Sequence, residues 1–223
     1  IAQGSMGYPA YLLAGSDGLA YAVEGLSDYA SGPVIANVRA NHPVVIVAGS
    51  RHEATRGQVE AISSTGVAKV IYLNPEPVLG SRKEKVGYSR EVMADFEQLI
   101  SAGRNVVLEW EDADSSDDTA ESSAEDSTAL ANFAGMLVYG IARRTALSGL
   151  IIAGGDTAFG VLRALGASTV DVEGEIEQGV PLGVIGDGVG AGLTIVTKAG
   201  GFGDDELFVR ALEVIRRPGR SEN

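Results

Sequence analysis

The sequence contains no cysteine, only two histidines and a single tryptophan in 223 residues. The absence of cysteine excludes disulfides, thiolate metal sites and a cysteine nucleophile, and it fits a cytoplasmic protein. The two histidines, His42 and His52, are too few for a metal site built from imidazoles. No hydrophobic run approaches the length of a membrane-spanning helix, and no signal peptide is recognisable. We therefore expect a cytoplasmic protein with no membrane partner.

Basic residues are also scarce, since 17 Lys and Arg stand against 30 Asp and Glu and give a net charge of −13. This balance argues against nucleic acid and anionic membranes as partners. Hydrophobic residues make up 45% of the chain, enough for a globular core. We expect residues 1–223 to form one domain.

Much of the negative charge lies in residues 109–127, a segment that consists almost entirely of Asp, Glu, Ser, Ala and Thr and has no Lys or Arg. Its acids are Glu109, Glu111, Asp112, Asp114, Asp117, Asp118, Glu121, Glu125 and Asp126. The simplest interpretation is a flexible, solvated insertion. A Ca²⁺ site is the alternative, but the EF-hand spacing and its glycine are missing, so we predict no metal site.

Apolar runs and helical patterns alternate along the chain. The expected strands are 43–48, 68–73, 105–109, 149–153 and 193–197, with an extended segment at 170–176 and a further strand, turn and helix within 11–29. The expected helices are 54–64, 88–102, 129–145, 158–165 and 205–216, while 74–87 is predicted to be a loop and 178–181 a turn. This alternation predicts an α/β fold with three layers, in which a mostly parallel sheet carries helices on both faces.

Two glycine-rich turns follow expected strands and precede expected helices. The first contains Gly154, Gly155, Asp156 and Thr157, and the second spans 197–205. Open α/β sheets bind ligands at such positions, where glycine lets the backbone approach a ligand and helix amides hold an anion. Asp156 and Thr157 could equally be helix caps. Together the turns predict a phosphate site built from main chain.

Lys198 lies beside three glycines of the second turn, including Gly200 and Gly201, and could direct its ammonium at a phosphate. The alternative is an exposed lysine in a loop. Ser50 ends the strand at 43–48 and is either a helix cap or a ligand-facing hydroxyl. His52 follows closely and could line the same cleft, although an exposed side chain is the commoner outcome for such a residue.

Several familiar motifs are absent. The glycines of 186–192 do not have the GxGxxG spacing and precede a strand instead of following one, so a surface loop is expected. The chain has neither a P-loop GxxxxGK[ST] nor a GxSxG nucleophile elbow.

Five segments taken together resemble the four-carbon acid sugar kinases, a family once catalogued as a domain of unknown function. They are Gly15–Ala20, Ala48–Ser50 with Thr55 and Gln58, Gly154–Thr157 with Val161–Gly166, Glu177–Pro181, and Thr197–Gly203. These segments are similar to the family's GSxGLA, GS-x₄-T-x₂-Q, GG[DE]T-helix-ALG, EPGVP and K-[SA]-G-[NG]-F-G motifs. They occur in the family's order and cover nearly the whole chain.

The resemblance implies the carboxy-terminal, nucleotide-binding half of a kinase that uses ATP and Mg²⁺. It implies that Ser50, the turn from Gly154 to Thr157 and Gly200 contact ATP, with Lys198 and Gly201 beside the phosphates or the adenosine. We expect the family's amino-terminal domain, which carries most sugar-acid contacts and the expected catalytic base, to be absent from this chain. It and a small sugar acid are the expected partners, and a homodimer is left open.

His52 and Glu53 depart from the family, whose members often have a Ser-Pro pair there, and so does the acidic segment. The function expected is ATP binding for phosphorylation of a terminal hydroxyl of a tetronate or 3-oxo-tetronate. A non-catalytic nucleotide- or phosphometabolite-binding module is the first alternative. A Rossmann-type oxidoreductase domain is the second, and the absent dinucleotide motif argues against it.

Overall fold

The structure is a computed structural model that describes residues 41–111 and 123–217. The strand, turn and helix expected within 11–29, with the Gly15–Ala20 motif, lie outside the described residues. So do residues 112–122 of the acidic segment.

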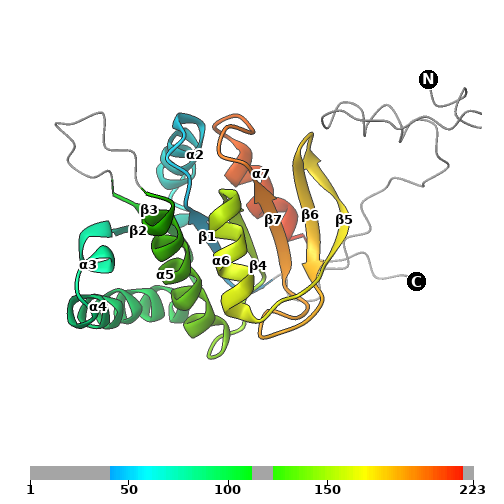
Figure 1. Ribbon diagram of the computed structural model, residues 1–223. Helices are drawn as coiled ribbons and strands as arrows, with labels where there is room; N and C mark the ends of the chain where they lie inside the picture. The colour runs from blue at the N-terminus through cyan, green and yellow to red at the C-terminus, as the bar shows by residue number, and fades with distance from the viewer. Residues whose placement is uncertain (1–40, 112–122, 218–223) are drawn as a thin grey trace, which may run out of the picture. The chain divides into compact units, whose positions relative to one another are not determined.

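One seven-stranded sheet forms the centre, with the order β2-β3-β1-β4-β7-β6-β5 (Figure 1). The strands are β1 (Val44–Ala48), β2 (Ala68–Leu73), β3 (Asn105–Trp110), β4 (Gly149–Ala153), β5 (Val170–Glu177), β6 (Val180–Ile185) and β7 (Thr194–Lys198). Neighbours from β2 to β7 pair in parallel, whereas β6 runs antiparallel to both β7 and β5. The mostly parallel sheet predicted from the sequence is confirmed.

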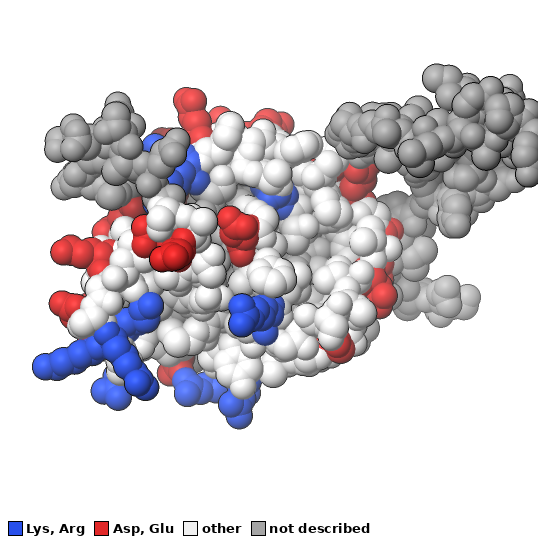
Figure 2. Space-filling model, in the orientation of Figure 1, with Lys and Arg blue, Asp and Glu red and all other residues white. Residues whose placement is uncertain are grey.

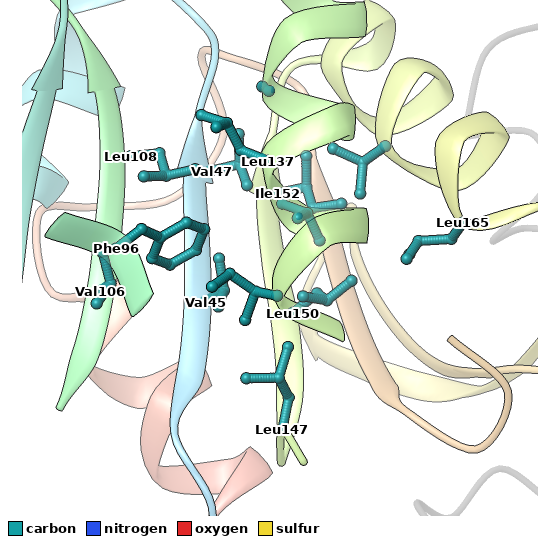
Figure 3. Packing of buried hydrophobic residues seen from close by; sticks show 14 of the residues in the cluster. Val45, Val47, Phe96, Val106, Leu108, Leu137, Leu147, Leu150, Ile152 and Leu165 are labelled. Atoms are coloured by element: carbon teal, nitrogen blue, oxygen red, sulfur yellow. The ribbon is translucent and has the colours of Figure 1, made fainter. Parts of the chain in front are cut away.

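Helices cover both faces of this sheet. They are α2 (Glu53–Ser64), α3 (Pro75–Leu79), α4 (Arg82–Ser101), α5 (Ala124–Ala142), α6 (Gly155–Leu165) and α7 (Leu207–Ile215). Alternate residues of a strand point to opposite faces. Val45 and Val47 therefore pack with α4, α5 and α6 (Figure 3). Val44 and Ile46 pack with α2 and α7 on the other face. The predicted three layers are confirmed.

The predicted loop at 74–87 is wrong, because this segment holds α3 and the start of α4. Pro75 occupies the first turn of α3, where its missing N–H leaves no hydrogen bond unmade. Ser81 and Glu84 form a capping box that begins α4. The expected turn at 178–181 is likewise too long, since Gly179 makes the turn with φ 80° and Val180 already begins β6.

The flexible insertion predicted for 109–127 is wrong at both ends, where the structure has a strand and a helix. Glu109 and Trp110 belong to β3, and α5 begins at Ala124 instead of 129. Ser123 and Asp126 form a second capping box, in which carboxylates of the first turn also favour the helix dipole. No helix within 41–111 and 123–217 is long and apolar enough to cross a bilayer.

Candidate functional site

The strands β1 and β4 lie side by side and parallel, and the direction in which the chain adds strands to the sheet reverses between them. After β1 it continues into α2 on one face, and after β4 into α6 on the other face. Such a switch point leaves a crevice outside the carboxyl ends of the two strands, where open α/β sheets bind ligands. Ser50 follows β1 at this edge, and Gly154 to Thr157 follow β4.

The turn after β4 leads directly into α6. Gly154 precedes the helix with φ 109° and ψ 129°, a backbone conformation that essentially only glycine adopts. Gly155, Asp156 and Thr157 then form the first turn, in which backbone N–H groups have no partner inside the helix. The predicted helix start at 158 is therefore three residues late. Asp156 is not the cap of this helix, because it lies within the first turn.

Other glycines serve contact between loops. A Cβ at Gly49 would collide with the Thr157 side chain, whose Cβ would lie 2.7 Å away. A Cβ at Gly200 would collide with the Ser50 hydroxyl, and one at Gly201 would lie 3.1 Å from Nε2 of His52. Gly155 differs, because a Cβ there meets nothing within 4 Å. Only Gly155 in this group therefore leaves open space for a ligand.

A cavity of about 300 Å³ lies at this edge. Its walls come from the ends of β1, β3 and β4, the first turn of α6, and α5. Of the residues predicted from the sequence, Ser50, Gly154, Gly155, Asp156, Thr157 and Gly200 line it. Lys198 and Gly201 do not belong to the lining. The structure thus brings together residues from three loops that are far apart in the sequence.

Charged side chains line the cavity on more than one side. Arg51 follows β1, and Arg56 belongs to α2. The acidic residues are Glu109 in β3, Glu111 just after it and Asp156 in α6. Sequence reasoning missed both arginines, although Arg51 directly follows Ser50. In Figure 2 many basic side chains gather instead along the lower edge, where Figure 1 places α4 and the end of α5.

The cavity also has an apolar part that was not predicted. Trp110 and Leu130 line it together with Ala131. The ring of Trp110 packs against that of Phe133, with ring centroids 6.1 Å apart and planes at 52°. The signal available in the sequence was the position of Trp110 at the end of a strand, since strand ends meet at the ligand edge.

Lys198 is buried beneath the glycine loop and does not point into the cavity. Only 4% of its surface is exposed, and Nζ donates to Thr55 Oγ1 at 2.9 Å and to the Gly200 carbonyl at 2.8 Å. The ammonium also lies 5.8 Å from the centre of the Phe208 ring. Burial lowers the pKa of Lys198 to about 8. The expected direct aim at a phosphate is replaced by contact with the Gly200 peptide.

His52 caps α2 instead of lining the cavity. Its Nδ1 accepts a hydrogen bond from the Ala54 amide at 3.2 Å, which requires that nitrogen to be unprotonated. The Ser50 hydroxyl oxygen accepts from the His52 amide at 3.2 Å, which fixes the Ser50 side chain at the cavity. Of the two roles that the sequence left open for Ser50, the helix cap belongs to His52 instead, and the Ser50 hydroxyl borders the cavity.

The lining of the cavity includes groups of the kinds that bind phosphate in other proteins. The first turn of α6 offers backbone donors, Gly155 leaves room for close approach, and two arginines supply positive charge. Asp156 supplies an exposed carboxylate, and Mg²⁺ in such sites commonly takes one or two carboxylates plus phosphate oxygens. Among residues 41–111 and 123–217, no three His, Asp or Glu side chains come together as a metal site by themselves.

Comparison with known proteins gives a family match over residues 45–208, to the nucleotide-binding C-terminal domain. The D-threonate kinase of Bordetella bronchiseptica is 31% identical over 183 residues, which are 82% of this chain and 43% of that protein. The D-threonate kinase of Salmonella typhimurium is 32% identical over 184 residues, covering 78% of this chain and 42% of that protein. The chain thus spans less than half the length of these relatives.

A solved structure from Bordetella bronchiseptica has the same fold. That protein, described as a domain of unknown function with bound citrate in a domain-swapped dimer, superposes with a TM-score of 0.67 at 28% identity. The match covers 82% of this chain and 42% of that one. The family match spans both glycine turns and the whole lining of the cavity. The chain therefore belongs to the nucleotide-binding C-terminal domains of the four-carbon acid sugar kinase family.

Proposed function

We propose that this chain is the ATP-binding half of a kinase that phosphorylates a terminal hydroxyl of a four-carbon sugar acid, a tetronate or 3-oxo-tetronate. The observation that carries the proposal is the junction of β1 and β4, where the open first turn of α6 faces a cavity that also holds Arg51 and Arg56. The D-threonate kinases supply the substrate class.

The residues around the cavity divide into two groups with different tasks. The amides of Gly155 to Thr157, the Ser50 hydroxyl and the two arginines would hold the phosphates. Trp110, Leu130 and Ala131 would cover the base, because an aromatic face stacks on a base without hydrogen bonding to it. This division fits one nucleotide lying across the cavity from α6 toward β3.

Phosphoryl transfer asks the protein mainly for positioning and for neutralisation of charge. Bound Mg·ATP would supply the transferred phosphoryl group and a cation at its oxygens. This chain would fix the phosphates through the helix amides and the arginines. Asp156, in the same turn of α6, would be the carboxylate available to the cation. We assign no catalytic base to the described residues and expect it in the amino-terminal domain.

The whole protein would have two further partners. The sugar acid would bind between this chain and the amino-terminal domain, since the relatives are more than twice as long as the matched region. The domain-swapped dimer of the Bordetella protein supports a homodimer of the complete protein.

Calorimetric titration of this chain with Mg·ATP tests the proposal, with NAD as control. We expect saturable binding of ATP and no response to NAD. Binding of NAD in place of ATP would favour an oxidoreductase domain. A chain that binds ATP but gives no kinase activity toward tetronates after its amino-terminal domain is restored would be a non-catalytic nucleotide-binding module.

A further inference from the structure

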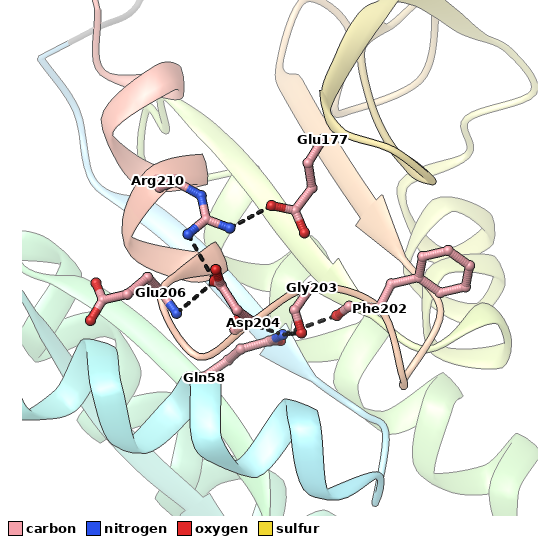
Figure 4. A network of polar contacts seen from close by, with 7 residues as sticks. All are labelled: Gln58, Glu177, Phe202, Gly203, Asp204, Glu206 and Arg210. Atoms are coloured by element: carbon pink, nitrogen blue, oxygen red, sulfur yellow. Dashed lines mark hydrogen bonds and ion pairs between the residues drawn. The ribbon is translucent and has the colours of Figure 1, made fainter.

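The side chain of Gln58 lies beneath the loop between β7 and α7 and binds three of its carbonyl groups. Nε2 donates to the carbonyl oxygens of Phe202 at 3.0 Å, Gly203 at 3.2 Å and Asp204 at 3.0 Å (Figure 4). Gln58 is 0% exposed. Since the amide has only two hydrogens, at least one of them is shared between carbonyls. A single buried side chain therefore sets the direction of three successive peptide groups.

Thr55, one turn earlier on α2, holds the beginning of the same loop. Its hydroxyl donates to the Gly200 carbonyl at 3.0 Å and accepts from Lys198 Nζ at 2.9 Å. Lys198 Nζ donates to the same carbonyl at 2.8 Å. Together Thr55 and Gln58 bind every carbonyl from 200 to 204 except that of Gly201. The face of α2 that contacts this loop therefore helps to fix the loop's backbone conformation.

Fixing a carbonyl also fixes the amide on the other side of the peptide. The peptide group is planar and trans, so a carbonyl turned toward α2 directs the N–H of the following residue away from it. The Gly200 carbonyl points to Thr55 and Lys198, and the Gly201 amide therefore points away from both. Neither the Gly200 nor the Gly201 amide donates a hydrogen bond to another residue of the described ranges. Gly200 itself borders the cavity.

The remaining polar atom of Gln58 supports a specific role for its amide. Oε1 is buried and has no hydrogen-bond partner among the described residues. An unpaired buried acceptor is destabilising, and an apolar side chain of similar size would avoid that penalty. A glutamine at this position is therefore explained by what its NH₂ group holds, and not by filling the space.

A second anchor makes the far end of the loop rigid from the opposite side. Arg210 donates to Asp204 Oδ1 at 2.8 Å and pairs with Glu177 at the end of β5 (Figure 4). The Glu206 amide donates to the same Asp204 oxygen at 3.0 Å. This anchor acts on the side chain of residue 204, whereas the peptides nearer the cavity are held by α2, by Lys198 and by the hydrogen bond from the Phe202 amide to the Ala199 carbonyl.

We propose that Thr55 and Gln58 are positioning residues of the nucleotide site, which hold the carbonyls of the β7–α7 loop against α2 and thereby keep Gly200 beside Ser50 at the edge of the cavity. The proposal rests on the proposed function, because it assumes a phosphorylated ligand in the cavity. Neither residue lines the cavity, so both act through the loop.

The test compares Gln58→Met with the wild-type chain by calorimetry with Mg·ATP and with adenosine. Methionine keeps the length of the side chain and removes the donor. We expect ATP to bind about tenfold more weakly and adenosine to bind as in wild type, since the loop borders the cavity beside Ser50, which is assigned to the phosphates. Gln98→Met, the same change at an exposed site of α4, is the matched control and should leave both affinities unchanged.

Thr55 gives an independent pair of variants if Gln58→Met does not fold. Thr55→Val keeps the shape and loses the hydroxyl, whereas Thr55→Ser keeps the donor to Gly200. Weaker ATP binding in Thr55→Val and normal binding in Thr55→Ser would support positioning. A wild-type chain that binds ATP while Gln58→Met and Thr55→Val bind it equally well would overturn the inference alone. An equal loss of adenosine affinity in these variants would also overturn the inference. A wild-type chain that does not bind ATP would overturn the proposed function.

Discussion

Gly49 and Thr157 are packed so closely that a Cβ on Gly49 would lie 2.7 Å from the Cβ of Thr157. The contact joins the end of β1 to the first turn of α6, and the Gly49 amide adds a 3.0 Å hydrogen bond to the Ala153 carbonyl. The two strand ends that form the crevice are therefore held together by direct packing of their loops.

Gly49→Ala should destabilise the domain, because overpacking at a rigid contact costs about 1–3 kcal/mol. Denaturant unfolding would measure the loss. Gly87→Ala is the matched control, since Gly87 lies within α4 with nothing within 4 Å of its added Cβ. There alanine should stabilise by about 0.5–1 kcal/mol through its higher helix propensity. Equal effects at the two positions would show that the Gly49 contact is not tight.

Trp110→Ala should weaken binding of ATP but not of inorganic tripolyphosphate. Stacking of an aromatic ring on a base contributes about 1–3 kcal/mol, so we expect a loss of about tenfold in ATP affinity by calorimetry. Tyr72→Ala removes an exposed aromatic side chain of β2 outside the cavity and should change neither affinity. Similar losses for both ligands in Trp110→Ala would contradict a base-binding role.

Lys198 should make stability depend on pH in the alkaline range. Burial lowers its pKa from 10.5 to about 8, so between these values the unfolded chain binds more protons than the folded one. The free energy of unfolding should then rise by about 2 kcal/mol from pH 7.5 to 9.5 through this group. The full contribution is present above pH 10.5 and is lost as the pH falls through about 8.

Lys198→Met isolates that contribution, because methionine fills similar space without a charge. As the pH rises, the free energy of unfolding of the wild type should increase relative to that of Lys198→Met. Lys69→Met, at an exposed position of β2, should show no such shift. A constant difference for Lys198→Met across the same range would mean that the buried ammonium titrates near its ordinary value.

The strands were predictable where apolar residues run without interruption. The bounds of β2 and β4 agree with those expected, and β1 differs by one residue. The antiparallel strand β6 was missed because Gly179 and Pro181 together indicate a turn, yet only Gly179 lies in the turn and Pro181 is the second residue of β6. The helix α3 and the start of α4 were missed because of Pro75 and Gly80, which begin and end α3 instead of excluding it, while the rest of α4 was predicted as 88–102.

The glycine turns of the candidate site and the polar residues beside them were predictable, but several other side chains that line the cavity were not. Glycine turns that follow apolar strands can be recognised in the sequence, and the carboxyl ends of parallel strands meet at one edge of the sheet. Gly154 and Gly200 could therefore be placed at the same edge. Arg56, Trp110 and Leu130 lie on elements whose facing depends on tertiary packing. Lys198 shows the same limit, because its neighbours in sequence suggest exposure and its neighbours in space bury it.

The central claim is that ATP phosphates lie against the first turn of α6, and Gly155→Val tests it most directly. A Cβ at Gly155 meets no protein atom within 4 Å, and Gly155 lines the cavity, so we expect the fold to tolerate valine while the ligand does not. Trp110 is the single tryptophan and lines the same cavity, so its fluorescence reports binding. Titration with Mg·ATP should give a saturable change in the wild type and in a Gly87→Val control, and none in Gly155→Val. Equal saturation in Gly155→Val would contradict the account.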